Sequence, residues 1–142
     1  MTQIIRDITE ITRAGAEYKA SRLSAYGLKG CHASYLAEIC ANPGISQDKL
    51  AQRICINKSN VARQVAVLEE DGFVQRLPSE ADKRVMELYP TEKTLAILPQ
   101  ITQMLRCWEN CITHDLTEEE KELLSALLRK MSSRASGYME DR

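Results

Sequence analysis

Aromatic residues are scarce in this 142-residue chain, and long apolar runs are missing. Phe, Trp and Tyr make up 5% of the residues, with a single Trp and a single Phe. The core must therefore be built from Leu, Ile, Val and Ala, a set that favours helices. No apolar run approaches the roughly 20 residues that a membrane-spanning helix needs. We therefore expect no membrane partner.

The chain also lacks an excess of positive or negative charge. The 19 Lys and Arg residues are matched by 20 Asp and Glu residues, which gives a formal net charge of −1. The whole chain has no electrostatic preference for nucleic acid or acidic lipid, so an anionic partner must be met by a local patch. Five cysteines without a Cys-x-x-Cys pair, in a chain without an apolar export segment at its start, indicate reduced thiols and a cytoplasmic location.

Both ends of the chain are predicted to form long amphipathic helices. In the first, apolar residues recur at intervals of four and three on a helix of about 20 residues: Ile4, Ile8, Ile11, Gly15 and Tyr18. A second stripe runs along a helix that Pro99 is expected to kink: Leu95, Leu98, Ile101, Leu105, Trp108 and Ile112. The last follows a capping box that starts at Thr117: Leu124, Leu127, Leu128 and Met131. Apolar stripes of this kind must be buried against another helix, of this chain or of a second copy.

The middle of the chain predicts a helix over 31–41, a short helix, a tight turn, a longer helix and a β-hairpin. Ser46 can cap a helix over 46–54, and Asn57 can cap one over 57–71. Residues 73–89 then read as two strands around an exposed turn. The order is that of a winged helix-turn-helix, whose second helix can enter a DNA major groove. The expected fold is mainly α with a small β-hairpin wing.

Cations gather in the segment expected to face DNA. Residues 46–64 contain four cations and one anion, whereas residues 69–71 are all acidic. Residues 58–60 open the second helix, where backbone N–H groups and the helix dipole favour a phosphate. One turn further on, Arg63 or Gln64 can reach base edges, because a guanidinium matches guanine and a Gln amide matches adenine.

Basic side chains also mark the hairpin, where Arg76, Lys83 and Arg84 are found. An arginine at this position can enter a narrow minor groove. The helix and hairpin together therefore predict contacts to both grooves.

Four segments carry a resemblance to a known family: ISQDKLA at 45–51, INKSNVAR at 56–63, LEEDGFVQR at 68–76 and DKR at 82–84. In order and spacing they resemble the multiple-antibiotic-resistance regulator (MarR) family, over nearly the whole chain. The resemblance assigns Asp82 and Arg84 to an Asp-x-Arg wing motif in which the Asp orients the Arg. Asn60 and Ala62 stand where the family usually has Ser or Thr, which removes hydroxyl contacts. The candidate DNA-binding residues are Ser46, Gln47, Lys58, Ser59, Asn60, Arg63, Gln64, Arg76, Asp82, Lys83 and Arg84.

The resemblance implies a single domain over 1–142 that works as a homodimer. Residues 1–30 and 91–142 would supply the dimerisation helices, and residues 31–90 the winged helix-turn-helix lobe. Each subunit would offer one lobe to a pseudo-palindromic site on double-stranded DNA, most often to repress transcription. Neither a cofactor nor catalytic activity is expected.

The resemblance also implies a pocket for a small aromatic or phenolic inducer, between the lobe and the dimerisation helices. The first, second and fifth helices would line it. The candidate lining residues are Tyr18, Tyr26, His32, Tyr35 and Trp108.

The cysteines leave an alternative open, a metal- or oxidant-responsive regulator of the same fold. Cys107 and Cys111 lie four residues apart and so share a helix face, while Cys31 and His32 begin another helix near the same crevice. Thiolates and an imidazole can hold zinc or copper, or one thiol can be oxidised and resolved by another. The other two cysteines are expected to pack as small apolar residues.

Two further alternatives come from other classes of protein. A winged-helix module that binds protein should show an apolar or acidic second helix, which Lys58 and Arg63 contradict. An enzyme could use a Cys/His nucleophile, at Cys31 with His32 or at a cysteine with His114. The sequence shows no third group that would orient such a pair.

Overall fold

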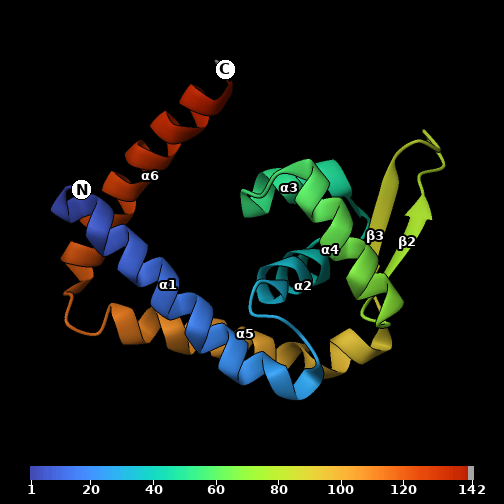
Figure 1. Ribbon diagram of the computed structural model, residues 1–142, viewed down its shortest axis with the longest axis horizontal. Coiled ribbons are helices and arrows are strands. Elements are labelled where there is room, and N and C mark those ends of the chain that lie inside the picture. The colour runs from blue at the N-terminus through green and yellow to red at the C-terminus, as the bar shows by residue number, and fades with distance from the viewer. Residues whose placement is uncertain (141–142) are drawn as a thin grey trace. The chain divides into compact units, whose positions relative to one another are not determined.

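The computed structural model describes residues 1–140. By internal contacts Met1–Trp108 forms one compact unit, and the residues from Glu109 onward form a second. Along the chain run α1 (Gln3–Leu23), the short 3₁₀ turn η1 (Ser24–Tyr26), α2 (His32–Ala41), β1 (Ile45–Ser46), α3 (Gln47–Ile54), α4 (Lys58–Glu70), β2 (Val74–Pro78), β3 (Met86–Pro90), α5 (Glu92–Ile112) and α6 (Glu118–Glu140) (Figure 1).

Side-chain caps start the helices where the sequence predicts them. The Ser46 hydroxyl accepts from the Lys49 N–H at the start of α3, and the Asn57 side chain accepts from the Asn60 N–H at the start of α4. Each cap satisfies one of the N–H groups that a helix start leaves without a partner. The helix-turn-helix is therefore defined locally on both sides of its turn.

One apolar core holds α2, α3, α4 and the strands together as a lobe. Val61, Val65 and Leu68 recur on one face of α4, and each is fully buried. Phe73 and Leu88 bring the hairpin onto the same core. Because the buried face of α4 is fixed in this way, the opposite face is left to solvent.

The sheet has three strands rather than the two of the predicted hairpin. Its order is β1-β3-β2, all antiparallel, with Arg76 opposite Leu88 and Ile45 also opposite Leu88. β1 has only two residues, too few for an alternating pattern to show. The turn that joins β2 to β3 takes up residues 79–85.

Within the first unit α1 packs directly on α5. Trp108 lies against Gly15, where an added Cβ would come within 3.2 Å of the indole nitrogen. The Trp108 ring also meets the Tyr18 ring, with 5.1 Å between centroids. The Tyr18 hydroxyl donates to the Met104 carbonyl at 3.3 Å. Pro99 lies inside the continuous helix α5.

Three successive carbonyls after α4 are bonded by the start of α5. Lys93 Nζ donates to Asp71 O at 2.8 Å, and Thr91 Oγ1 donates to Gly72 O at 2.6 Å. The third is Phe73 O, which accepts from the buried Thr94 hydroxyl at 2.5 Å. The end of α4 is thereby attached to the first turn of α5.

The second unit contains α6, which begins with the predicted capping box. The Thr117 N–H donates to the Glu120 carboxylate at 2.9 Å, and the Glu120 N–H donates to the Thr117 hydroxyl at 3.1 Å. The apolar stripe of α6 is exposed. Among the described residues no helix is long and apolar enough to cross a membrane.

Candidate nucleic-acid interface

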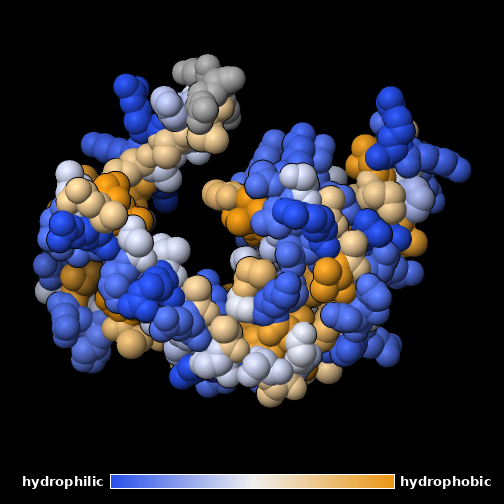
Figure 2. All heavy atoms as spheres, in the orientation of Figure 1, coloured by the Kyte–Doolittle hydropathy of each residue, from blue (hydrophilic) through white to orange (hydrophobic). Residues whose placement is uncertain are grey.

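The exposed face of α4 carries polar side chains at helical spacing. Ser59 and Arg63 are exposed one turn apart, with Asn60 beside them. One guanidinium nitrogen of Arg63 lies 3.4 Å from the Asn60 side-chain oxygen, and the Ser59 hydroxyl donates to Asn57 at 3.0 Å. The surface over α3 and the start of α4 is mostly hydrophilic (Figure 2). The remaining donors of Arg63 are free to reach guanine.

Val67 is a residue of this face that the sequence interpretation missed. It follows Arg63 by four residues on α4 and is 36% exposed. An exposed apolar side chain there can contact the methyl group of thymine. Ser59, Arg63 and Val67 follow each other at intervals of four residues, and this spacing in the sequence predicts that they share one face of the helix.

Lys58 is the first residue of α4, and its Nζ lies 3.4 Å from the Asp48 carboxylate of α3. The two side chains are 69% and 70% exposed. An ion pair this exposed adds little stability. Lys58 can therefore exchange Asp48 for a DNA phosphate at little cost.

Gln64 departs from the sequence prediction, because its side chain is directed into the lobe. Its amide oxygen lies 2.8 Å from His32 Nε2, and the residue is only partly exposed. The oxygen that an adenine contact needs is thus already in use. Of the two residues that the sequence offered as base readers, Arg63 is exposed and Gln64 is bonded within the lobe. The predicted DNA contact of Gln64 stays a prediction.

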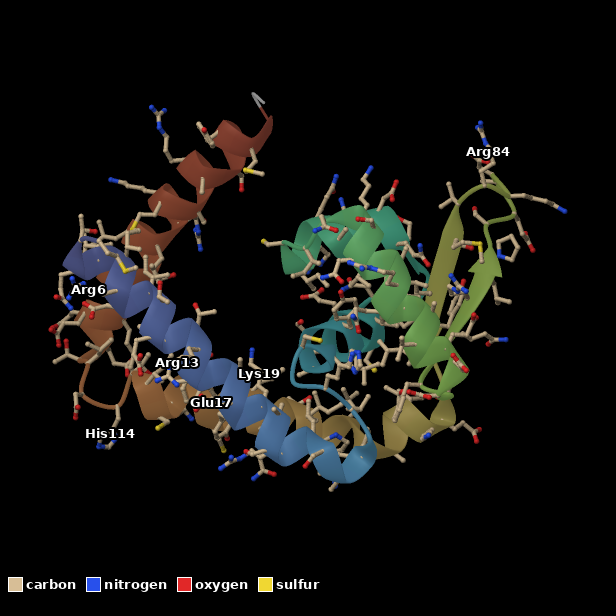
Figure 3. All side chains as sticks on the ribbon, viewed as in Figure 1. Arg6, Arg13, Glu17, Lys19, Arg84 and His114 are labelled. Atoms are coloured by element: carbon tan, nitrogen blue, oxygen red, sulfur yellow. The ribbon has the colours of Figure 1, made fainter. Side chains whose placement is uncertain are left out.

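The hairpin tip presents one arginine held by its neighbour. Asp82 accepts from the Arg84 backbone N–H and Nε, both at 3.1 Å, and from Nη2 at 3.2 Å. The pKa of the Asp82 carboxyl is lowered by these bonds, first the guanidinium and then the backbone one. The Arg84 side chain is 91% exposed and projects from the tip, away from the helices (Figure 3). Lys83 beside it is exposed too.

The guanidinium of Arg76, which the sequence placed among the basic side chains of the hairpin, is bonded to Glu69 of α4. Glu69 accepts from its backbone N–H and from Nε, both at 3.0 Å. The guanidinium bond, followed by the backbone bond, lowers the pKa of the Glu69 carboxyl. Arg76 connects β2 to the last turn of α4, and its predicted contact to DNA stays a prediction.

Ser46 and Gln47 are both turned toward the lobe, but within residues 1–140 only Ser46 has a bonding partner there. The Ser46 hydroxyl serves as the α3 cap, and the Gln47 side-chain oxygen is buried without a hydrogen-bond partner among the described residues. Their predicted contacts to DNA stay predictions.

A cavity of about 400 Å³ lies between α1 and α5 in the first unit. The Arg22 guanidinium stacks 3.7 Å from the centre of the Tyr18 ring. Within residues 1–140 no carboxylate forms an ion pair with Arg22. The lining residues are Tyr18, Arg22, Leu23, Tyr26, Gln100, Gln103, Met104 and Cys107.

The sequence interpretation placed Tyr18 and Tyr26 at this cavity but not Arg22, although the three are spaced by four. His32 and Tyr35 lie elsewhere, each 2% exposed in the core of the lobe. Trp108 packs on Gly15 and is not part of the lining.

The cysteines are all free. Cys107 lines the cavity, whereas Cys31 is exposed at the start of α2 and does not. Cys111 is exposed on α5. Cys55 is exposed too, in a left-handed conformation with φ of 59° at the turn between α3 and α4, so its expected burial was wrong. Across the part of the chain that the structure describes, no group of three or more His, Cys, Asp or Glu side chains could hold a metal ion.

Comparison with protein families matches residues 32–86 to the MarR family. The HTH-type transcriptional regulator YybA of Bacillus subtilis (strain 168) is 35% identical over 131 residues, 92% of this chain and 87% of that protein. The HTH-type regulator BilQ of Clostridium symbiosum is 30% identical over 105 residues, which are 74% and 73% of the two chains.

Solved structures agree in fold over nearly the whole length. The transcriptional regulator SlyA is 30% identical with a TM-score of 0.93, and the match covers 98% of each chain. A MarR family regulator of Listeria monocytogenes, solved in complex with 26mer DNA, is 28% identical with a TM-score of 0.88, over 94% of this chain and 89% of that one.

Proposed function

This chain belongs to the MarR family of DNA-binding transcriptional regulators, and we propose that it represses transcription by binding a pseudo-palindromic operator as a homodimer. The observation that carries the proposal is the exposed polar face of α4 beside a hairpin tip that holds Arg84 on Asp82. α4 enters the major groove and Arg84 the adjacent minor groove. The Listeria relative, solved with DNA, supports this assignment.

A second copy of the chain covers the exposed apolar stripes. Ile4, Ile8 and Ile11 of α1 are 40–62% exposed, and Leu127 and Leu128 of α6 are each 46% exposed. Apolar stripes of this kind mark association surfaces. We assign dimerisation to residues 1–30 and 91–142, and DNA binding to residues 31–90. A two-fold dimer places its two recognition helices in successive major grooves, about 34 Å apart.

The cavity between α1 and α5 holds the effector, a small aromatic or phenolic molecule. Arg22, stacked on the Tyr18 ring, offers a cation with no carboxylate partner among the described residues. The rest of the Tyr18 ring offers aromatic contact, and Gln100 and Gln103 offer amides. An anionic aromatic ring satisfies all three kinds of group. Its binding shifts the population between dimers that fit the operator and dimers that do not.

The test is fluorescence anisotropy with duplex DNA from the region upstream of the chain's own gene, over a salt series. We expect affinity to fall steeply with salt, because several Lys and Arg contacts to phosphates release counterions. The double variant Arg63→Ala/Arg84→Ala should lose at least tenfold in affinity.

Arg13→Ala is the matched control, because Arg13 is an exposed arginine of α1 with local partners, Glu10 and Glu17 (Figure 3). It should bind as the wild type does. Equal binding by the wild type and the double variant would show that the assigned DNA-facing surface is wrong.

A further inference from the structure

His32 is a buried ionisable side chain that is bonded to the recognition helix α4. Its Nδ1 lies 3.1 Å from the Lys29 backbone nitrogen, and its Nε2 lies 2.8 Å from the Gln64 side-chain oxygen. Gln64 belongs to α4, whereas Lys29 belongs to the loop between η1 and α2. One imidazole therefore connects that loop to α4.

The two contacts define the state of the ring. The Lys29 N–H can only donate, so Nδ1 must be unprotonated and accept. Nε2 then carries the proton and donates to the Gln64 oxygen. The imidazole makes both bonds only when it is neutral and in this tautomer, because a proton on Nδ1 would face the Lys29 N–H.

The loop that His32 contacts is itself closely packed on α1. An added Cβ at Gly30 would lie 3.0 Å from both Ala16 O and Ala20 N, so the loop backbone rests on the helix backbone. The same loop begins directly after Tyr26, which lines the cavity. A continuous series of contacts thus runs from α1 through Gly30, Lys29 and His32 to α4.

We propose that His32 is a positioning residue for DNA binding, which acts through Gln64 to hold α4 at the rotation that presents Arg63 and Ser59 to the major groove. The proposal rests on α4 being the recognition helix. Gln64 lies on the flank of α4, next to the buried face, so its bond to His32 resists rotation of the helix about its own axis. The Lys29 bond anchors the ring to the loop, and the Gln64 bond passes that anchor to α4. In the protonated ring Nε2 still donates to Gln64 but Nδ1 no longer accepts from Lys29. Without either bond, the recognition face is less well ordered.

The groups around His32 determine how acid acts on it. Burial lowers the pKa of His32 most, the hydrogen bond to Gln64 raises it, the Lys29 cation lowers it, and the Asp71 carboxylate at the end of α4 raises it. Tyr35 of α2 meets the ring edge-on, with 6.2 Å between centroids. Burial, and after it the Cys31 thiol, raises the pKa of Tyr35. The folded-state pKa of His32 lies below the ordinary value of 6.5. The ring is therefore neutral at pH 6.5 and above, and the neutral form is lost as the pH falls through the lowered pKa.

Three variants separate the two bonds. In His32→Gln the amide nitrogen stands where Nε2 stood and still donates to Gln64, but it does not titrate. His32→Asn is too short to reach Gln64 but keeps an oxygen where Nδ1 accepts from Lys29. In Gln64→Glu the carboxylate keeps the bond and favours the protonated ring, which raises the pKa of His32.

The experiment uses full-length protein and a duplex enriched by wild type from a random pool at pH 7.5. Affinity for that duplex, relative to a scrambled duplex of equal length, is measured from pH 5 to 8. The ratio removes the general effect of pH on phosphate contacts. His114→Gln is the control, because His114 is the chain's other histidine and is exposed after α5.

For wild type and His114→Gln we expect a constant ratio above about pH 6.5 and a falling ratio in acid. His32→Gln should keep a nearly flat ratio, and Gln64→Glu should move the acid loss to higher pH. At pH 7.5 His32→Asn should lower the ratio about tenfold, with unchanged affinity for the scrambled duplex. Gln64→Met, which removes only the acceptor at a partly exposed position, should give a similar loss and serves if His32→Asn does not fold.

The proposal is overturned if His32→Gln retains the acid loss of wild type, or if Gln64→Met binds the selected duplex as wild type does. Failure of wild type to enrich any duplex would instead overturn the assignment of α4 as a recognition helix, and this proposal with it. The two failures are therefore distinguishable.

Discussion

Glu69 accepts hydrogen bonds from both the backbone N–H and the guanidinium of Arg76, which joins the last turn of α4 to the first strand of the hairpin. Arg76 lies opposite Leu88 on β3, and Leu88 is fully buried in the core. The wing and the recognition helix are thus held in one orientation by a charged pair rather than by apolar packing alone.

Replacing Glu69 by Gln should reduce the free energy of unfolding by about 0.5–1 kcal/mol at pH 7, because the pair is partly exposed and screened. The folded-state pKa of Glu69 lies below its ordinary value of 4.5. The contribution is therefore present above pH 4.5 and is lost as the pH falls through the lowered pKa. Urea unfolding at pH 7 and near pH 3 measures the difference.

Glu70→Gln is the matched control for that measurement, because Glu70 is the next residue and is exposed. It should change stability by less than about 0.5 kcal/mol. If Glu69→Gln behaved like Glu70→Gln at both pH values, the bond to Arg76 would have no energetic role.

Arg63→Ala and Lys58→Gln should weaken operator binding in different ways. Loss of a base contact at Arg63 should cost about 1–3 kcal/mol and relax the sequence preference at one position of each half-site. Loss of a phosphate contact at Lys58 should weaken all sequences alike and reduce the salt slope by about one per contact. Binding-site selection and salt titrations distinguish the two. Identical changes in both assays would contradict the assignment.

Gly30→Ala should destabilise the fold more than Gly15→Ala. At Gly30 the new methyl group would meet backbone atoms of α1 at 3.0 Å, and backbone cannot move aside easily. We expect a loss of about 1–3 kcal/mol. At Gly15 the neighbour is the Trp108 side chain at 3.2 Å, and the higher helix propensity of Ala offsets part of the contact. Chemical unfolding of the two variants side by side checks the order, which should not invert.

Leu127→Asp should convert the proposed homodimer into a monomer, since a carboxylate in an apolar interface is strongly unfavourable. Light scattering after gel filtration should then report the chain mass of 16.1 kDa instead of twice that value. Ser133→Asp places the same charge on the opposite side of α6 and should leave the dimer intact. A dimeric Leu127→Asp protein would show that this stripe is not part of the interface.

Local signals in the sequence were enough for the helix-turn-helix. The caps at Ser46 and Asn57 and the stripe of Val61, Val65 and Leu68 involve residues within a few positions of each other. Each of these features was confirmed because its physical cause lies within one or two helical turns. β1 was missed because two residues do not make a pattern, and it exists only through its pairing with β3.

Side-chain roles that depend on distant partners could not be read in the same way. Gln64 meets His32 across 32 positions, and a glutamine on a helix flank carries no mark that a histidine elsewhere will use its oxygen. Arg76 likewise looked like a free cation until the turn at Gly72, with φ of 83°, brought β2 back beside Glu69. Arg22 lines the cavity only because α1 packs on α5, and an arginine in a helix carries no local sign of such a neighbour.

The bonds from the start of α5 to the carbonyls of residues 71–73 hold the end of α4 rigidly to the first turn of α5, at the corner between the two helices. α4 has 13 residues and is therefore about 20 Å long. A rotation of α5 by only about 5° at this corner would displace the far end of α4 by about 2 Å, the scale of helix shifts that switch other proteins. In the proposed dimer, this corner would transmit a small rearrangement between the subunits to the far end of α4, and so change how well the two helices fit the spacing of DNA grooves.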